Sequence, residues 1–246
     1  MRAHVRSIGH VGEHEPRMEP ARVERLRRWH ERAALELHAR SDADVEYLGL
    51  HLHVPARVFP PTPMSHLLGE AVIAAAGPGD RVLDMGTGSG VNAILAARSG
   101  ADVVAVDVNP AAVEAARANA DAAGVGDRVE VVEADLFAAI DDRFDVVVFD
   151  PPFRWFTPAD MAERAITDDG YDTLRRFFEQ VVDHLRPGGR VLLSFGSTGD
   201  VAYLHELAQR AGLEVAELAS ASLERDGQVE TYWAFRLTVD EPGLRG

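Results

Sequence analysis

The sequence predicts an α/β fold in which helices cover both faces of a doubly wound, mostly parallel sheet of seven strands. Between residues 81 and 211, short continuous apolar runs alternate with helix-like segments, as is typical of parallel strands buried on both faces. A cluster of glycines follows the first of these runs. Two further β-like segments, residues 213–219 and 231–239, have no helix between them. They predict an antiparallel hairpin at one edge of the sheet.

The composition is that of a globular protein and restricts the partners it can have. A chain of 246 residues can bury one sizeable core, so we expect a single domain with an appendage. The formal net charge is -15, and a surface this acidic disfavours nucleic acid relative to a protein or a small molecule. The chain has no cysteine, which excludes disulfides, thiolate metal sites and a cysteine nucleophile.

The first 16 residues show no periodicity, and we expect a flexible tail there. They contain scattered charges and no apolar run, so a secretory signal is not expected. No window of the sequence approaches the ~20 apolar residues that a membrane span needs. A cytoplasmic protein without membrane contact is therefore expected.

Residues 17–54 are expected to form an N-terminal extension of one helix and short strands. Val23, Leu26, Ala33 and Leu37 recur at helical spacing between about residues 20 and 40. Residues 1–40 hold nine arginines against six acidic residues, so this part is basic within an acidic chain. The helix is then either a packing element with a solvated arginine face or a lid or substrate-docking helix. We place it across the carboxyl edge of the sheet, near residues 60–65 and Phe153.

Residues 45–54 alternate loosely and predict one or two short strands. His51 and His53 share a face there, but the sequence offers no third ligand, so we expect no metal site. The prolines of residues 58–63 then exclude regular structure before a helix that Ser65 can cap and that runs through Ala76. This proline-rich segment is either a wall of a ligand site or a simple connection.

The remaining elements follow from the alternation of apolar runs and helical periodicity. We expect strands at 81–85, 102–107, 128–133, 144–150 and 190–195, and helices at 90–98, 110–123, about 171–185 and 200–211. Residues 187–189, Pro-Gly-Gly, should end the third of these helices. Ligands of such folds bind at the carboxyl ends of the strands. The residues at these ends are Asp84, Asp107, Asp135, Asp150 and Ser194.

The glycine cluster lies at residues 86, 88 and 90, directly after the first strand. Glycines at these places let a flat ligand approach the backbone, and Asp107 at the end of the next strand can accept hydrogen bonds from two ribose hydroxyls. A dinucleotide fingerprint would require glycine where the chain has Val91, which disfavours a nicotinamide oxidoreductase. The pattern therefore favours a nucleoside site. The alternative is a tight turn without a ligand.

Two further strand ends carry acidic residues. Asp135 can accept the exocyclic amine of adenine or is an ordinary surface acid. Asp150-Pro151-Pro152-Phe153 ends a buried strand, and its two prolines fix an extended, rigid backbone. Asp150 can then accept N–H bonds from a planar amine or amide while Phe153 stacks on it. An Asp-Pro turn that merely ends the strand is the structural alternative.

Taken together, these stretches resemble a known family. Residues 82–97, 106–119, 133–136 and 144–153 are similar to motifs I to IV of class I S-adenosylmethionine-dependent methyltransferases with an Asn/Asp-Pro-Pro-Tyr/Phe/Trp motif. The segment from Val58 to Leu68 also resembles its counterpart in HemK-type glutamine methyltransferases and related small-domain methyltransferases. The resemblance covers roughly residues 55–240.

The resemblance implies a Rossmann-like methyltransferase domain at residues 55–246 that binds S-adenosyl-L-methionine. The implied cofactor-binding residues are Pro61, Thr62, Asp84, Gly86, Thr87, Gly88, Gly90, Asp107, Val108, Asn109, Asp135 and Leu136. The implied catalytic residues are Asp150, Pro151, Pro152 and Phe153. No metal is implied.

The sequence departs from the HemK-type pattern in its central motif, because those enzymes usually have Asn-Pro-Pro-Tyr. The Asp form is more familiar among methyltransferases that act on nucleic-acid amines. The expected function is methyl transfer to a planar amide or amine nitrogen of a protein or small molecule. An rRNA or tRNA base N-methyltransferase and a non-catalytic S-adenosylmethionine-binding subunit remain as alternatives.

Overall fold

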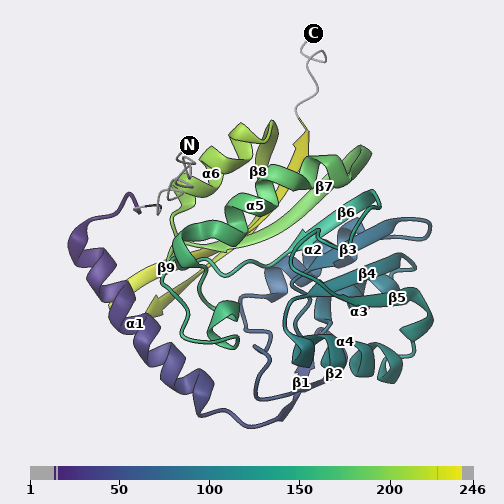
Figure 1. Ribbon diagram of the computed structural model, residues 1–246, viewed down its shortest axis with the longest axis horizontal. Coiled ribbons are helices and arrows are strands. Elements are labelled where there is room, and N and C mark those ends of the chain that lie inside the picture. Colours follow the sequence, from purple (N-terminus) through teal and green to yellow (C-terminus); the bar gives the residue numbers. More distant parts are fainter. Residues whose placement is uncertain (1–13, 15, 226, 240–246) are drawn as a thin grey trace, which may run out of the picture.

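The computed structural model describes residues 14, 16–225 and 227–239. It contains a seven-stranded sheet in the order β5-β4-β3-β6-β7-β9-β8, and a separate two-stranded hairpin, β1-β2. Helices lie on both faces of the large sheet (Figure 1). The expected fold class is thus confirmed. Among the described residues, none of the helices combines the length and the apolar character that crossing a bilayer requires.

Five strands of the large sheet pair with one another in parallel, and β9 runs antiparallel to both of its neighbours, β7 and β8. The parallel strands are β3 (Arg81–Met85), β4 (Asp102–Asp107), β5 (Val129–Glu133), β6 (Phe144–Phe149) and β7 (Leu185–Gly196). The C-terminal hairpin consists of β8 (Leu213–Arg225) and β9 (Gln228–Val239). The small hairpin consists of β1 (Ala43–Tyr47) and β2 (Leu50–Val54).

Successive residues of each strand face opposite sides of the sheet, and each side has its own hydrophobic core. On one side Leu83 and Val147 belong to the cluster that includes α5 (Asp172–Gln180), α6 (Val201–Arg210) and Leu26 of α1 (Pro20–His38). On the other side Val82 and Val146 pack with α2 (His66–Ala75), α3 (Val91–Arg98), α4 (Pro110–Ala122) and β2. The apolar strand runs are therefore a consequence of two-sided burial.

The observed elements correct three local expectations. The helix expected at about 171–185 is α-helical only to Gln180 and continues as a 3-10 turn (Val181–His184). β7 begins at Leu185, and residues 186–189 form an irregularity in its pairing with β6, so Pro-Gly-Gly lies within the start of the strand. Ser65 makes no capping hydrogen bond. Its hydroxyl instead accepts a bond from the Thr62 amide.

The N-terminal extension packs against the domain at both ends of α1. Arg22 donates hydrogen bonds to the Ser197 carbonyl and to buried Glu230, each at 2.8 Å. At the other end His38 Nε2 lies 2.9 Å from the Asp160 carboxylate. Of the expected flexible tail, residues 1–13 and 15 lie outside the described residues. His14 stacks on the Tyr203 ring with a centroid distance of 3.6 Å.

Gly90, the residue before α3, provides a test of the helix packing. Its φ is 84°, and a Cβ there would lie 3.0 Å from Cα of Ala116 on α4. Gly124 also has a positive φ, 72°, but a Cβ there meets nothing within 4 Å. We expect Gly90→Ala to lower the free energy of unfolding by about 1–3 kcal/mol more than Gly124→Ala, because only the former adds a steric clash. Chemical denaturation measures the difference, and equal losses would contradict this account.

Candidate functional site

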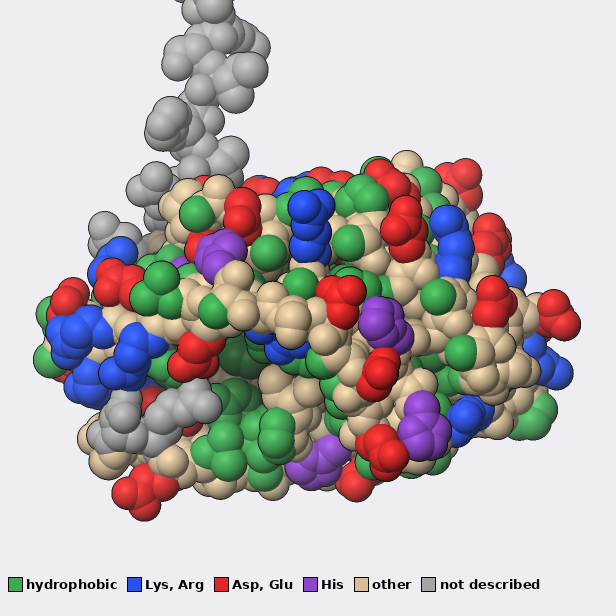
Figure 2. Space-filling model, turned by 90° about the horizontal axis from the view of Figure 1, so that it is seen from below, with side chains coloured by type: hydrophobic (Ala, Val, Ile, Leu, Met, Phe, Trp, Pro, Cys, Tyr) green, Lys and Arg blue, Asp and Glu red, His purple; other side chains and the backbone are tan. Residues whose placement is uncertain are grey.

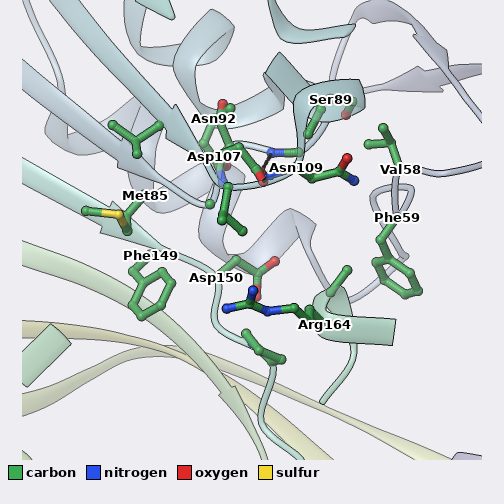
Figure 3. Close-up of a pocket in the computed structure, with 18 of the residues that line it drawn as sticks. Val58, Phe59, Met85, Ser89, Asn92, Asp107, Asn109, Phe149, Asp150 and Arg164 are labelled. Atoms are coloured by element: carbon green, nitrogen blue, oxygen red, sulfur yellow. Dashed lines mark hydrogen bonds between the residues drawn. The ribbon is translucent and has the colours of Figure 1, made fainter. Parts of the chain in front are cut away.

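A cavity of about 190 Å³ lies at the carboxyl ends of β3, β4 and β6 (Figure 3). Parallel strands bring their carboxyl ends to one edge of the sheet, which is why residues far apart in the sequence meet there. The cavity is closed from the side by the proline-rich segment. Its lining includes Val58, Phe59, Pro61, Met85, Gly86, Thr87, Gly88, Ser89, Asn92, Asp107, Val108, Asn109, Asp135, Leu136, Phe149, Asp150, Pro152, Met161 and Arg164.

Asp107 fixes the shape of the glycine loop. Its Oδ2 accepts a hydrogen bond from the Gly88 amide at 2.9 Å, and its Oδ1 accepts one from the Asn109 amide at 2.8 Å. Burial raises the pKa of Asp107, while these amide bonds oppose that rise. Because each carboxylate oxygen can accept more than one hydrogen bond, Asp107 keeps acceptor capacity for hydroxyl groups in the cavity.

Asp84 lies beneath the loop and is not part of the cavity lining. Its Oδ2 accepts hydrogen bonds from Thr87 Oγ1 at 2.7 Å and from the Ala93 amide at 3.0 Å. These bonds join the end of β3 to the loop and to the first turn of α3. The carboxyl is almost fully buried, and this burial raises its pKa to about 7.

The chemistry of the cavity fits a nucleoside with an amino-acid tail. At Gly88 the φ of 57° places the backbone in the left-handed region, so a side chain there would strain the loop that forms the cavity wall. Apolar side chains such as Val108 and Leu136 provide a surface for a base. Asp135 lies beside them, and its Oδ2 is 3.0 Å from Nη1 of Arg176, so part of its acceptor capacity is used by an ion pair.

A second cavity, of about 510 Å³, adjoins the first. It is lined by α1, the proline-rich segment, the Asp-Pro-Pro-Phe motif and β7 to β9, and aromatic rings are frequent in it. Its lining includes Trp29, Ala33, Glu36, Leu37, Arg40, Phe59, Thr62, Pro63, Ser65, Asp150, Pro151, Pro152, Phe153, Ser194, Phe195, Tyr232 and Trp233. Figure 2 shows a hollow with hydrophobic side chains on the corresponding face of the molecule, near a group of basic side chains.

Asp150 and Pro152 line both cavities. One carboxylate oxygen of Asp150 accepts a hydrogen bond from the Ser194 hydroxyl. The carboxylate is open to solvent through the cavities, but the protein encloses it on the other sides, and this desolvation raises its pKa. The Asp-Pro-Pro-Phe motif therefore lies where the two cavities meet.

The position of Phe153 is fixed from three directions. Its ring packs edge-on against Phe195 and Tyr232, with centroid distances of 5.6 and 6.0 Å. Its carbonyl accepts a hydrogen bond from the Tyr171 hydroxyl at 2.8 Å. Tyr171 is fully buried, so the motif is held by the core.

The structure brings most of the sequence-predicted residues together and separates a few. Thr62 lines the second cavity, whereas Pro61 lines the first. Gly90 lines neither, since it packs against α4. The expected position of the N-terminal helix is confirmed, because Trp29, Ala33 and Leu37 line the second cavity together with Pro63, Ser65 and Phe153.

Several lining residues were missed by sequence reasoning. Arg164 and Met161 reach the first cavity from the irregular segment 154–171, which has no periodicity or motif that could have marked them. Tyr232 and Trp233 reach the second cavity from β9. Of the two histidines considered above, His51 lies near Glu46 and His53 near Asp44. No group of three or more candidate metal ligands occurs in the described part of the chain.

The architecture places the chain in the class of Rossmann-like α/β folds. The ribosomal protein L11 methylase of Lactobacillus delbrueckii has a similar fold, with a TM-score of 0.52, 22% identity and coverage of 72% of this chain and 80% of that one. The 16S rRNA N2 G1207 methyltransferase of T. thermophilus, solved with AdoMet and guanosine, gives a TM-score of 0.57, 24% identity and coverage of 80% and 50%.

Within that class, the chain belongs to the methyltransferase small domain family, whose profile matches residues 63–209. The release factor glutamine methyltransferase of Cereibacter sphaeroides is 35% identical over 68% of this chain and 64% of its own length. The putative protein N5-glutamine methyltransferase of Methanocaldococcus jannaschii is 30% identical over 66% of this chain and 85% of its own length. The release factor glutamine methyltransferase of Koribacter versatilis is 36% identical, and the match spans 59% of its length.

The buried carboxyl of Asp84 predicts a pH dependence of stability. Its pKa is about 7 in the folded protein against an ordinary 3.8, so between these values the folded protein keeps a proton that the unfolded chain releases. The contribution of Asp84 to the free energy of unfolding therefore falls as the pH rises from about 4 to 7. In Asp84→Asn the amide oxygen can accept the same two hydrogen bonds without titrating.

We expect the stability of Asp84→Asn relative to the unchanged protein to increase steadily across that pH range. Denaturant titrations of both proteins at several pH values measure it, and the difference between the two proteins removes the contribution of other groups. A difference that does not vary with pH would show that Asp84 is not protonated in the folded state.

Proposed function

We propose that this protein is an S-adenosylmethionine-dependent methyltransferase that methylates the side-chain amide nitrogen of a glutamine in a protein. Membership of the family and the names of the Cereibacter sphaeroides and Methanocaldococcus jannaschii relatives support this reaction. The single observation that carries the proposal is the position of Asp150 and Pro152 at the junction of the two cavities. Methyl transfer needs a donor and an acceptor that meet at one point.

In this proposal the first cavity holds the cofactor. Asp107 accepts the ribose hydroxyls, the loop from Gly86 to Gly88 lies against the tail, and Asp135 and Leu136 border the adenine. When bound, S-adenosylmethionine supplies a methyl group on a sulfonium, an electrophile for a nitrogen acceptor. Asp84 acts indirectly by holding the loop through Thr87 and Ala93.

The second cavity holds the acceptor, and Asp150 orients it. With one carboxylate oxygen bonded by Ser194, the other oxygen and the Asp150 carbonyl are available to accept the two N–H bonds of an amide. Phe153 offers a ring against the amide plane. This arrangement positions the nitrogen and requires no strong base, since the proton can leave after transfer. Asp150 serves here in the place of the more usual asparagine, because orientation needs only acceptor oxygens.

The charge of the chain and the names of its relatives support a protein acceptor. The net charge of -15 disfavours a nucleic-acid acceptor, and the Bradyrhizobium diazoefficiens relative is a ribosomal protein uL3 glutamine methyltransferase. With a protein acceptor of this kind, the enzyme is proposed to act in the cytoplasm. Residues 55–246 carry the methyltransferase domain, and α1 within residues 17–54 serves as a lid over the acceptor.

Labelled methyl transfer to a cell extract tests the function. Extract from a strain that lacks the protein is incubated with purified protein and S-adenosylmethionine carrying a labelled methyl group, and is then separated into protein, RNA and small molecules. We expect label in protein, and mass spectrometry should place one added methyl on a glutamine. Label confined to RNA would contradict the proposed acceptor. Absence of transfer together with retained cofactor binding would favour a non-catalytic subunit.

Asp107 tests the cofactor site. Asp107→Ala should weaken the binding of S-adenosylmethionine by ~1.5–3 kcal/mol, the scale of lost hydrogen bonds to a charged group. Isothermal titration calorimetry measures the affinity, and a thermal melt checks that the variant folds. An unchanged dissociation constant in the folded variant would exclude the ribose role.

Asp150 tests the acceptor site. If it only positions the nitrogen, Asp150→Ala should lower kcat by orders of magnitude while the cofactor affinity hardly changes. Ser194→Ala removes only the hydrogen bond to Asp150 and should cause a smaller loss. Equal losses of binding and turnover, or a fully active Asp150→Ala, would contradict the role.

The lid is tested by deleting residues 1–40. The cofactor cavity has no lining residue from α1, whereas the second cavity has several. The truncated protein should therefore fold and bind cofactor but transfer methyl groups poorly, because the acceptor cavity loses one wall. Trp29→Ala should show a milder form of the defect, with Leu35→Ala, on the exposed side of α1, as the control. Unfolding of the truncated protein would show that α1 is a packing element.

A further inference from the structure

The first cavity contains one cationic side chain among several acids. Asp107, Asp135 and Asp150 line it, and of the described lining residues only Arg164 carries a positive charge. Asp135 is already paired with Arg176. The role of Arg164 is not explained by the nucleoside-binding features of the cavity, since ribose and adenine are neutral.

The Arg164 side chain points into the first cavity and takes no part in holding the fold together. Figure 3 shows its guanidinium projecting into the space beside Asp150. Within residues 14, 16–225 and 227–239, it makes no hydrogen bond or ion pair. Burial raises the pKa of Asp107, and the charge of Arg164 is among the smaller influences that lower it. The guanidinium therefore lies within electrostatic range of Asp107.

The turn that carries Arg164 is firmly held. It is a short 3-10 segment (Glu163–Ala165), and the buried Glu163 side chain accepts a hydrogen bond from the Ala159 amide at 2.7 Å. The Glu163 amide donates to Asp160 at 3.0 Å, and the Thr167 hydroxyl donates to the Phe156 carbonyl at 2.7 Å. An unpaired arginine on an ordered turn is prepared to bind an anion without a large loss of conformational freedom.

The cofactor proposed above has one anionic group. Its amino-acid tail carries an ammonium group, for which backbone carbonyls are suitable acceptors, and a carboxylate, which needs donors. A guanidinium can bind a carboxylate through two parallel, charge-assisted hydrogen bonds. We infer that Arg164 binds the α-carboxylate of S-adenosylmethionine and so distinguishes this cofactor from nucleosides without the amino-acid tail. The inference rests on the proposed function.

Two ligands that differ only in the tail test the inference. S-adenosylhomocysteine has the full tail, whereas 5′-methylthioadenosine has the same nucleoside and thioether but no carboxylate. By calorimetry, Arg164→Gln should weaken S-adenosylhomocysteine about 10- to 100-fold, the scale of a charge-assisted bidentate pair, and leave 5′-methylthioadenosine within about twofold. Arg164→Lys should recover part of the loss, because it restores the charge but not the fork.

Two comparison variants separate the possible causes. Asp107→Asn should weaken both ligands by similar factors, because it acts on the ribose that they share. Arg128→Gln, which removes an arginine paired with Asp102 at the surface, should change neither. Equal weakening of both ligands by Arg164→Gln, or no change for either, would overturn the carboxylate assignment while leaving the methyltransferase proposal intact. Failure of the unchanged protein to bind either ligand would instead overturn the proposed function.

Discussion

The hydrogen bonds of Asp107 are the interaction on which the site depends. Its two oxygens bind amides from the glycine loop and from the residue before α4, and so connect the ends of β3 and β4. Within the loop the Gly90 amide donates to the Thr87 carbonyl, whereas the Gly88 amide donates to the Asp107 side chain. An acid at the neighbouring strand end supplies the acceptor, and the same acid remains able to bind hydroxyls.

Asp84 supports the glycine loop from beneath, but burying its carboxyl costs solvation free energy. A carboxyl with so little solvent access is unfavourable when charged, which is why its pKa is raised to about 7. In return, its Oδ2 joins the Thr87 hydroxyl to the Ala93 amide. Asp84, at the end of β3, therefore holds the glycine loop in place. The loop and Asp107 together form the cavity wall.

The N-terminal helix and the segment 154–171 are connected with each other as well as with the cavities. His38 pairs with Asp160, and His30, whose burial lowers its pKa to about 4, packs against Phe156 with a centroid distance of 5.0 Å. The same segment carries Arg164 into the first cavity, while α1 lines the second. The two cavities therefore share a boundary that is built from segments in contact with each other.

The sequence by itself determined the order of the elements, the two-sided burial of the strands, and the polar residues at the strand ends. These features are local: apolar runs, glycines and prolines restrict the backbone wherever they occur, and parallel strands then place Asp107 and Asp150 at one edge. Only the tertiary structure decided that Ser194 binds Asp150, that Trp29 and Trp233 share a cavity with Phe153, and that Arg164 enters the other cavity. These residues come from segments without a diagnostic pattern, and their meeting depends on how irregular backbone and an appended helix pack against the sheet. That packing is set by many weak contacts over the whole molecule, which no local stretch of sequence encodes.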